Sequence, residues 1–266
     1  MKKILILCLV FGVALVGYGQ KTYQLASPNG EIKMNVKVSD KIQYDIFYGE
    51  ESLLEKGTMR MQVGEQVLGM NPKVVKSTTR LVDENIHPVV PFKFSTIRNH
   101  YNQLLLKFSG NWSVEFRAFD DGVAYRFITN KKGEVEVNEE LFQVDFPEDY
   151  QMHIQQSGDF GTNYELFYEH PKYSEWKGKK GVTLLPMLIE AKNGHKILIS
   201  ESSVSDYPHM FLAPADNHGI SSAFPKCPIE FGENGDRSLK LLKHADYIAK
   251  TSGKRGFPWR YFVITK

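Results

Sequence analysis

The sequence predicts an all-β protein that folds as a single domain, a large antiparallel sandwich of two sheets. Apolar and polar residues alternate with period two in segment after segment, and Gly, Pro, Asn and Asp separate nearly all of these segments. No stretch has the pattern of an amphipathic helix longer than two turns. Many short strands separated by turns are typical of sandwiches and barrels, and the strand-like segments here are numerous for one small sandwich.

Residues 1–19 have the pattern of a cleaved signal peptide. A short basic start precedes an apolar run, and small residues stand before the expected cleavage site after Gly19. An uncleaved anchor is the alternative, but the apolar run is short for a bilayer span. We therefore expect export to the periplasm or the medium, a mature domain of residues 20–266, and no membrane span after cleavage.

The first strands of the mature chain are the most regular. Glu31–Val38 alternates without a break between polar and apolar residues, which predicts a strand with one buried and one solvated face. Lys41–Gly49 follows across a short turn, so the two segments are expected to pair as antiparallel neighbours.

Phe116–Thr129 predicts a tight hairpin. Asp121-Gly122 stands between two alternating, aromatic-rich runs, and Gly readily adopts the positive φ that tight hairpin turns need. Asp120 and Asp121 form an adjacent carboxylate pair, but the preference of Asp for turns explains both residues without catalysis.

Two later segments depart from the strand pattern. Asn163–Gly178 is expected to be irregular or briefly helical, because Pro171 limits any helix there. Cys227 is the one cysteine of the mature chain, and no histidine is placed by the sequence to activate it. We expect a small buried side chain at this position.

Composition and motifs exclude several function classes. Lys and Arg number 33 against 31 Asp and Glu, and no basic stripe with interleaved aromatic residues stands out, so nucleic acid is not an expected partner. The sequence has no Gly-x-Ser-x-Gly, His-x-x-x-His or Cys-x-x-Cys motif. No catalytic residue is assigned.

Aromatic and acidic residues gather in the segment from Tyr164 to Trp176. Sugars stack on aromatic rings while carboxylates accept hydrogen bonds from their hydroxyl groups, and pockets of this mixed character are the general form of ligand sites. A loop whose aromatic residues pack beneath it is the alternative. The candidate carbohydrate-binding residues are Tyr164, Glu165, Tyr168 and Trp176.

Glu201 breaks the pattern of its own strand, because it lies on the same face as Ile197 and Ile199. Periodicity leaves three interpretations open. The strand has ended and the carboxylate has reached solvent, it pairs internally with an arginine such as Arg260, or it is a ligand for a hard cation. Solvent is favoured by periodicity alone, because unpaired Glu is almost never fully buried.

Several motifs in order resemble the N-terminal domain of glycoside hydrolase family 97. They are "YQLASPNGEIKMNVKV", "FRAFDDGVAYRF", "KILISESSVSDYPHMFL" and "FPWRYFVIT", and the resemblance runs from about Tyr23 to Lys266. It implies a β-super-sandwich akin to galactose mutarotase. In this family the sandwich precedes a catalytic (β/α)₈ barrel that acts on α-glucosides or α-galactosides and carries the catalytic acids.

The resemblance also implies a role for Glu201. The family contributes one carboxylate of the sandwich to a Ca²⁺ at the barrel active site, and the motif places it at Glu201. Ca²⁺ is therefore expected only when a barrel is present. The expected partners are an α-linked oligosaccharide and a separately encoded barrel, which would cover Tyr207, Met210 and Phe211. A stand-alone carbohydrate-binding or scaffold module is the alternative function.

Overall fold

The computed structural model describes residues 20–90, 93–216, 218–236 and 238–266 and shows an all-β sandwich. The predicted fold class is confirmed. The signal peptide predicted for residues 1–19 lies outside the described residues. Among the described residues, no helix is long and apolar enough to cross a membrane.

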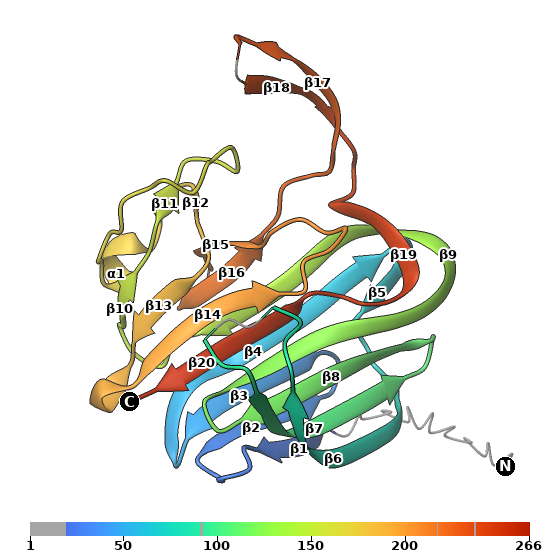
Figure 1. Cartoon of the computed structure of the whole chain (residues 1–266), viewed down its shortest axis with the longest axis vertical. Coiled ribbons are helices and arrows are strands. Elements are labelled where there is room, and N and C mark those ends of the chain that lie inside the picture. The colour runs from blue at the N-terminus through green and yellow to red at the C-terminus, as the bar shows by residue number, and fades with distance from the viewer. Residues whose placement is uncertain (1–19, 91–92, 217, 237) are drawn as a thin grey trace, which may run out of the picture.

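The strands and two short helices follow one another along the chain with few long gaps (Figure 1). In chain order they are β1 (Lys21–Ala26), β2 (Ile32–Val38), β3 (Ile42–Tyr48), β4 (Glu51–Val63), β5 (Gln66–Leu68), β6 (Val74–Ile86), β7 (Ile97–Phe108), β8 (Trp112–Phe119), β9 (Gly122–Asp145), β10 (Gln151–His153), β11 (Gln156–Ser157), α1 (Tyr173–Trp176), β12 (Val182–Thr183), β13 (Met187–Glu190), η1 (Lys192–Gly194), β14 (Lys196–Ser202), β15 (Phe211–Pro214), β16 (Gly219–Ala223), β17 (Pro228–Asn234), β18 (Ser238–His244), β19 (Ala249–Gly256) and β20 (Trp259–Thr265).

The long strand β9 joins the two layers of the sandwich (Figure 1). Its first part, residues 122–125, lies between β8 and β20, and its last part, residues 137–145, pairs with β4 and at its end with β16. One layer therefore runs β6-β7-β8-β9-β20-β14-β13-β10, and the other runs β1-β2-β3-β4-β9-β16-β15-β12-β11.

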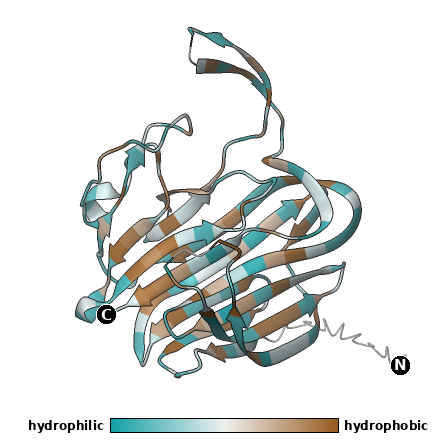
Figure 2. Ribbon diagram, in the orientation of Figure 1, coloured by the Kyte–Doolittle hydropathy of each residue, from teal (hydrophilic) through white to brown (hydrophobic). Residues whose placement is uncertain are grey.

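Period-two patterning fixes which face of each strand is buried. In β2 every second residue is buried, from Ile32 through Met34 and Val36 to Val38, and Figure 2 shows the same alternation on other strands. β2 pairs antiparallel with β1 and β3, so the predicted pairing of the first two regular segments is confirmed.

An aromatic cluster fills the core where β9 bends. Tyr125 and Phe142 come from the two parts of this one strand, and their ring centroids are 6.5 Å apart. Phe262 of β20 lies 5.7 Å from Phe142, and Tyr44 of β3 lies 5.6 Å from Tyr125. All four side chains are fully or almost fully buried, so both layers share one core.

The predicted hairpin between β8 and β9 is confirmed, but its glycine acts differently. Phe119 pairs with Gly122, so Asp120 and Asp121 are the two turn residues and Gly122 is the first residue of β9. A Cβ atom at Gly122 would lie 2.1 Å from the carbonyl oxygen of Phe262. Close approach to β20, and not a positive φ, therefore requires the glycine.

One hairpin stands away from the sandwich. β17 and β18 pair only with each other in the part of the chain that the structure describes, and Figure 1 shows them projecting from the body. Cys227 lies at the base of this hairpin and is half-buried, so the expectation of a buried cysteine is wrong. The segment 163–178 is irregular apart from the one-turn helix α1, as predicted.

Candidate functional site

Glu201 faces the interior of the sandwich at the end of β14. It lies on the same face as the fully buried Ile197 and Ile199, and its side chain is 6% exposed. The favoured interpretation that this carboxylate reaches solvent is therefore wrong. The strand continues one residue further, so Glu201 is still held in the sheet.

Three groups hold the Glu201 carboxylate. Arg260, directly opposite on β20, donates to Oε2 from Nη1. The backbone N–H of Met210 lies 3.1 Å from Oε1 and 3.2 Å from Oε2, and His209 Nδ1 lies 2.9 Å from Oε1. The internal pair with Arg260 was one of the three interpretations left open by the sequence, and it is confirmed.

Arg260 binds a second carboxylate as well. It is fully buried, and its Nε and Nη2 donate to the two oxygens of Glu140 on β9 at 2.8 Å each. The Tyr207 hydroxyl donates to Glu140 Oε2 at 2.7 Å. This set, Glu140, Glu201, Arg260 and Tyr207, is called the Arg260 cluster below.

The electrostatics of the Arg260 cluster follow from burial and charge. Burial lowers the pKa of the Arg260 guanidinium, but the charges of Glu140 and Glu201 outweigh that effect and raise it, so the group stays protonated. Burial, together with the charge of Glu140, raises the pKa of Tyr207 well above its ordinary value. Two carboxylates facing one guanidinium leave the cluster with a formal excess of one negative charge.

The excess charge lies close to the surface on one side. His209 contacts Glu201, and the His209 side chain is 65% exposed. Rotation of this one imidazole ring would uncover Oε1 of Glu201, while Arg260 and the Met210 N–H would continue to hold the carboxylate. Elsewhere in the described residues, as here, no three His, Cys, Asp or Glu side chains gather to hold a metal ion.

The aromatic segment from Tyr164 to Trp176 begins close to the Glu201 carboxylate. The ring of Tyr164 lies 6.4 Å from that of His209 and 6.2 Å from that of Phe211. Burial and the nearby charge of Glu201 raise the pKa of Tyr164. The structure thus brings Tyr164 close to Glu201. The sequence analysis had named them separately, as a candidate sugar contact and a candidate metal ligand.

The other candidates of this segment differ in exposure. Tyr164 is 43% and Tyr168 50% exposed, and the exposed Glu165 accepts a hydrogen bond from Asn163 Nδ2 at 3.1 Å. Trp176 is fully buried, and its Nε1 donates to Gln156 at 2.9 Å. Its proposed contact with a sugar is wrong, because α1 turns the indole ring into the core.

The comparisons with known proteins identify the family and the fold. Residues 25–266 match the N-terminal domain of glycosyl hydrolase 97. The chain belongs to glycoside hydrolase family 97. A retaining alpha-galactosidase of Bacteroides thetaiotaomicron is 34% identical over 280 aligned positions, which take in 100% of this chain but 42% of that protein.

Solved structures share the fold of this family 97 domain. A family 97 enzyme from Pseudoalteromonas sp. strain K8, in complex with acarbose, has a TM-score of 0.74 at 18% identity and is matched over 91% of this chain and 35% of its own. A beta-arabinopyranosidase has a TM-score of 0.72 at 21% identity, with 91% and 40% covered. The chain therefore spans less than half the length of each of these relatives.

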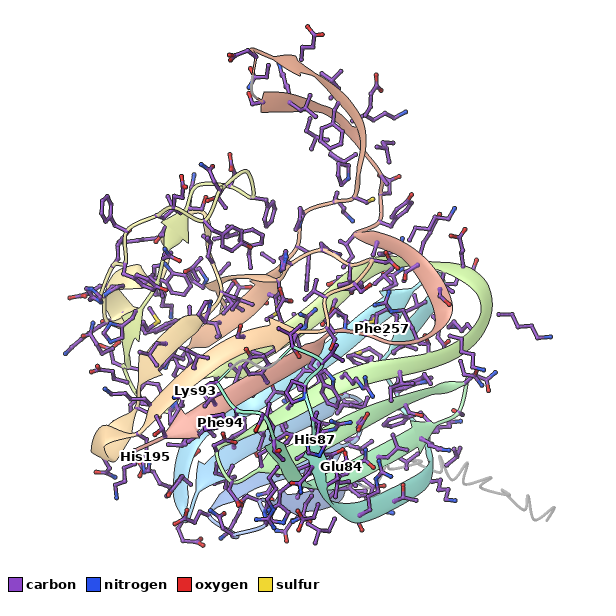
Figure 3. All side chains as sticks on the ribbon, in the orientation of Figure 1. Glu84, His87, Lys93, Phe94, His195 and Phe257 are labelled. Carbon is purple, nitrogen blue, oxygen red and sulfur yellow. The ribbon has the colours of Figure 1, made fainter. Side chains whose placement is uncertain are left out.

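Sequence reasoning missed one member of the Arg260 cluster, Glu140, and misplaced another, Tyr207. Glu140 shares a strand face with Phe142 and Val144, the same signal that singled out Glu201. Met210 and Phe211 are buried and Tyr207 is half-buried, so the expectation that they form an exposed interface is wrong. Tyr207 packs edge-on against Phe257, with ring centroids 5.7 Å apart. Figure 3 labels Phe257 where the chain leaves β19.

Proposed function

We propose that the chain is the non-catalytic sandwich of an exported α-glycosidase of family 97, acting on α-glucosides or α-galactosides, and that Glu201 supplies one ligand to a Ca²⁺ held by the catalytic domain. The observation that carries the proposal is the Glu201 carboxylate, which Arg260 holds on one side and the exposed His209 ring contacts on the other. Membership of family 97 and the longer alpha-galactosidase relative support it.

Glu201 can provide part of a calcium site, but not all of its ligands. Ca²⁺ takes six to eight oxygen ligands, and Glu201 offers two at most. Its Oε1 becomes available when His209 turns away, and its Oε2 remains bonded to Arg260. The other oxygens then come from the catalytic domain, where the bound ion would stabilise negative charge near the reacting sugar. Arg260 holds the carboxylate in position.

A chimera tests this function. This chain replaces the aligned N-terminal part of the Bacteroides alpha-galactosidase, and hydrolysis of an aryl α-galactoside is measured against Ca²⁺ concentration. We expect Ca²⁺-dependent activity, and Glu201→Gln should raise the Ca²⁺ concentration for half-maximal activity about tenfold or more, the value of one charge-assisted contact. Glu165→Gln, an exposed carboxylate in the nearby loop, is the matched control.

The outcomes separate the parts of the proposal. An active chimera whose Glu201→Gln variant responds to Ca²⁺ like the parent would contradict the ligand role. A folded chimera without activity would contradict the supporting role of this sandwich. This chain by itself is expected to release no nitrophenol from aryl α-glucosides or α-galactosides.

A carbohydrate-binding module is the second candidate function, and one observation favours it. Phe167 is 95% exposed and stands between the exposed Tyr164 and Tyr168, close to Glu165 in sequence. Large exposed aromatic groups of this kind are often binding surfaces. Retarded migration of the protein in a gel that contains α-glucan, lost in Phe167→Ala, would support this function, and unretarded migration would contradict it.

Export is part of the proposal. The basic and apolar start of the sequence supports a signal peptide that is removed after Gly19. Intact-mass measurement of the protein from a bacterial periplasm should give a chain that begins at Gln20. Retention of the full N-terminus in the membrane fraction would support the uncleaved anchor instead.

A further inference from the structure

A pocket of about 730 Å³ lies on a different face of the sandwich from the Arg260 cluster. It is formed by the β8–β9 turn, the start of β20 and the facing ends of β6 and β7. The rings of Phe119, Trp259 and Tyr261 line it together with the polar side chains of His100, Asp120 and Asp121. This size and this mixture of aromatic and polar groups are usual for small-molecule sites.

Arginines fix the position of Trp259 in the pocket. The guanidinium groups of Arg117 and Arg126 lie 4.4 Å and 4.3 Å from the centroid of its ring. Both arginines are ion-paired with Glu115, which is almost fully buried. Because these partners restrain the indole ring, a ligand that meets it would not need to order it first.

The charges around the pocket favour a neutral ligand. Arg98 lines the pocket, but both its Nε and its Nη2 are bonded to Asp83 at 2.8 Å, and Arg117 is paired with Glu115. Glu115 is shared by Arg117 and Arg126, which leaves one formal positive charge there. The carboxylates of Asp120 and Asp121 in the pocket outweigh it, which disfavours an anion.

Three hydrogen-bonding groups in the pocket have no side-chain partner among the described residues. The exposed carboxylate of Asp121 makes no side-chain hydrogen bond or ion pair within the described residues, and the same holds for Trp259 Nε1 and the Tyr261 hydroxyl. One acceptor of full charge, one N–H donor and one hydroxyl around aromatic rings match the hydroxyl groups and apolar C–H faces of a sugar.

We propose that this pocket is a binding site for a neutral oligosaccharide, with Asp121 accepting hydroxyl protons and Trp259 and Tyr261 contacting the ring. The site involves neither Glu201 nor the loop from Tyr164 to Trp176. It requires no Ca²⁺ and no catalytic domain. Either this proposal or the function proposed above can therefore be contradicted without affecting the other.

Tryptophan fluorescence tests the site directly. Of the three tryptophans of the chain, Trp112 and Trp176 are buried and Trp259 is partly exposed, so a ligand in the pocket should change the emission of Trp259 and its quenching by acrylamide. Panose, a neutral trisaccharide, is titrated to millimolar concentration. We expect a saturable change with wild type that persists in EDTA.

Variants separate this pocket from the aromatic loop. Asp121→Ala should weaken panose binding about tenfold, because it removes a charged hydrogen-bond acceptor. Tyr261→Phe, which removes the hydroxyl alone, should weaken it less. Tyr168→Ala reports separately on the aromatic loop, and Glu233→Gln on the exposed β17 is the control that should bind like wild type. Circular dichroism confirms that each variant is folded, and isothermal titration calorimetry gives a second measure of binding.

Four results would overturn the proposal. They are no change in fluorescence or heat with panose, an unchanged affinity in Asp121→Ala, loss of binding in Tyr168→Ala while Asp121→Ala binds normally, and tighter binding of the anionic sugar trigalacturonate than of panose. The third result would place the saccharide on the aromatic loop instead.

Discussion

Arg260 lies fully buried between the carboxylates of Glu140 and Glu201, with its charge shared between two strands of the sandwich. A charge in this position is tolerated because every partner is in place. Removal of one partner leaves the others buried without compensation, which costs more than the pair itself contributes.

Arg260→Met should therefore destabilise the protein strongly. We expect the free energy of unfolding to fall by about 3–5 kcal/mol, the cost of breaking a buried ion pair. Urea denaturation followed by fluorescence measures it. Arg60→Met is the control, because Arg60 and Glu139 form a surface pair that contributes about 1 kcal/mol or less. Equal effects of the two substitutions would show that the Arg260 cluster is not coupled as described.

Glu201→Gln should destabilise the isolated chain, contrary to what an exposed position implies. The neutral amide loses the charged bonds to Arg260 and His209, so a loss of about 1–3 kcal/mol is expected. Thermal unfolding of the two proteins is the measurement. An unchanged melting temperature would mean that the carboxylate is held less tightly than the structure indicates.

Glu115 should make stability depend on pH on the acid side. Burial raises its pKa, but the bonds to Arg117 and Arg126 outweigh burial and bring it below the ordinary value of 4.5. A depressed folded-state pKa stabilises the protein above the unfolded pKa, and this contribution is lost as the pH falls through the folded value. The difference in unfolding free energy between wild type and Glu115→Gln should be largest near neutral pH and shrink in acid. A difference that grows in acid would contradict the sign.

At the scale of elements, β9 decides how the layers meet, and the glycine at its start decides how closely β20 can approach. The carbonyl oxygen of Phe262 occupies the place where a side chain at Gly122 would begin. The hairpin β8–β9 and the edge of the pocket therefore depend on one backbone contact.

Gly122→Ala should destabilise the fold by about 3 kcal/mol, the upper end of the cost of overpacking. Gly158→Ala is the matched control, because a Cβ atom there meets nothing within 4 Å. Guanidinium denaturation of both variants is the measurement. Similar midpoints for the two variants would show that β20 can shift away from β9 at little cost.

At the scale of the whole molecule, the hairpin β17–β18 forms a sheet of its own, apart from the other described strands. Its exposed apolar side chains include Ile229, Phe231 and Leu239, each at least 50% exposed. An isolated two-stranded hairpin is marginally stable in water, and apolar surface of this kind promotes association.

Replacing residues 229–243 with a short Gly-Ser bridge should leave the sandwich intact. The free energy of unfolding is expected to change by less than about 1 kcal/mol, because no described core residue is removed. Self-association at high concentration, measured by light scattering after gel filtration, should decrease. Phe231→Ser with Leu239→Ser should act in the same direction, and a large loss of stability would show that the hairpin packs on the sandwich.

Local pattern was sufficient for most of the strands. Alternation from Glu31 to Val38 specifies a strand and its buried face because the period of a strand is two. The same pattern placed Glu201 on the inner face, but it could not show whether a cationic side chain lies opposite to pair with it. That required the register of β14 against β20, which sets Glu201 opposite Arg260.

The sequence by itself determined the all-β class, the β8–β9 hairpin and the motifs of family 97, because these depend on residues that are near neighbours in the chain. Only the tertiary structure decided that Trp176 is buried, that Glu140 joins Glu201 at Arg260, and that Trp259 and Asp121 line one pocket. These pairs lie far apart in sequence, and antiparallel pairing across β9, β14 and β20 brings them together. Whether a side chain is buried, and whether its charge is paired, depends on residues from distant strands. A local sequence pattern therefore cannot predict either.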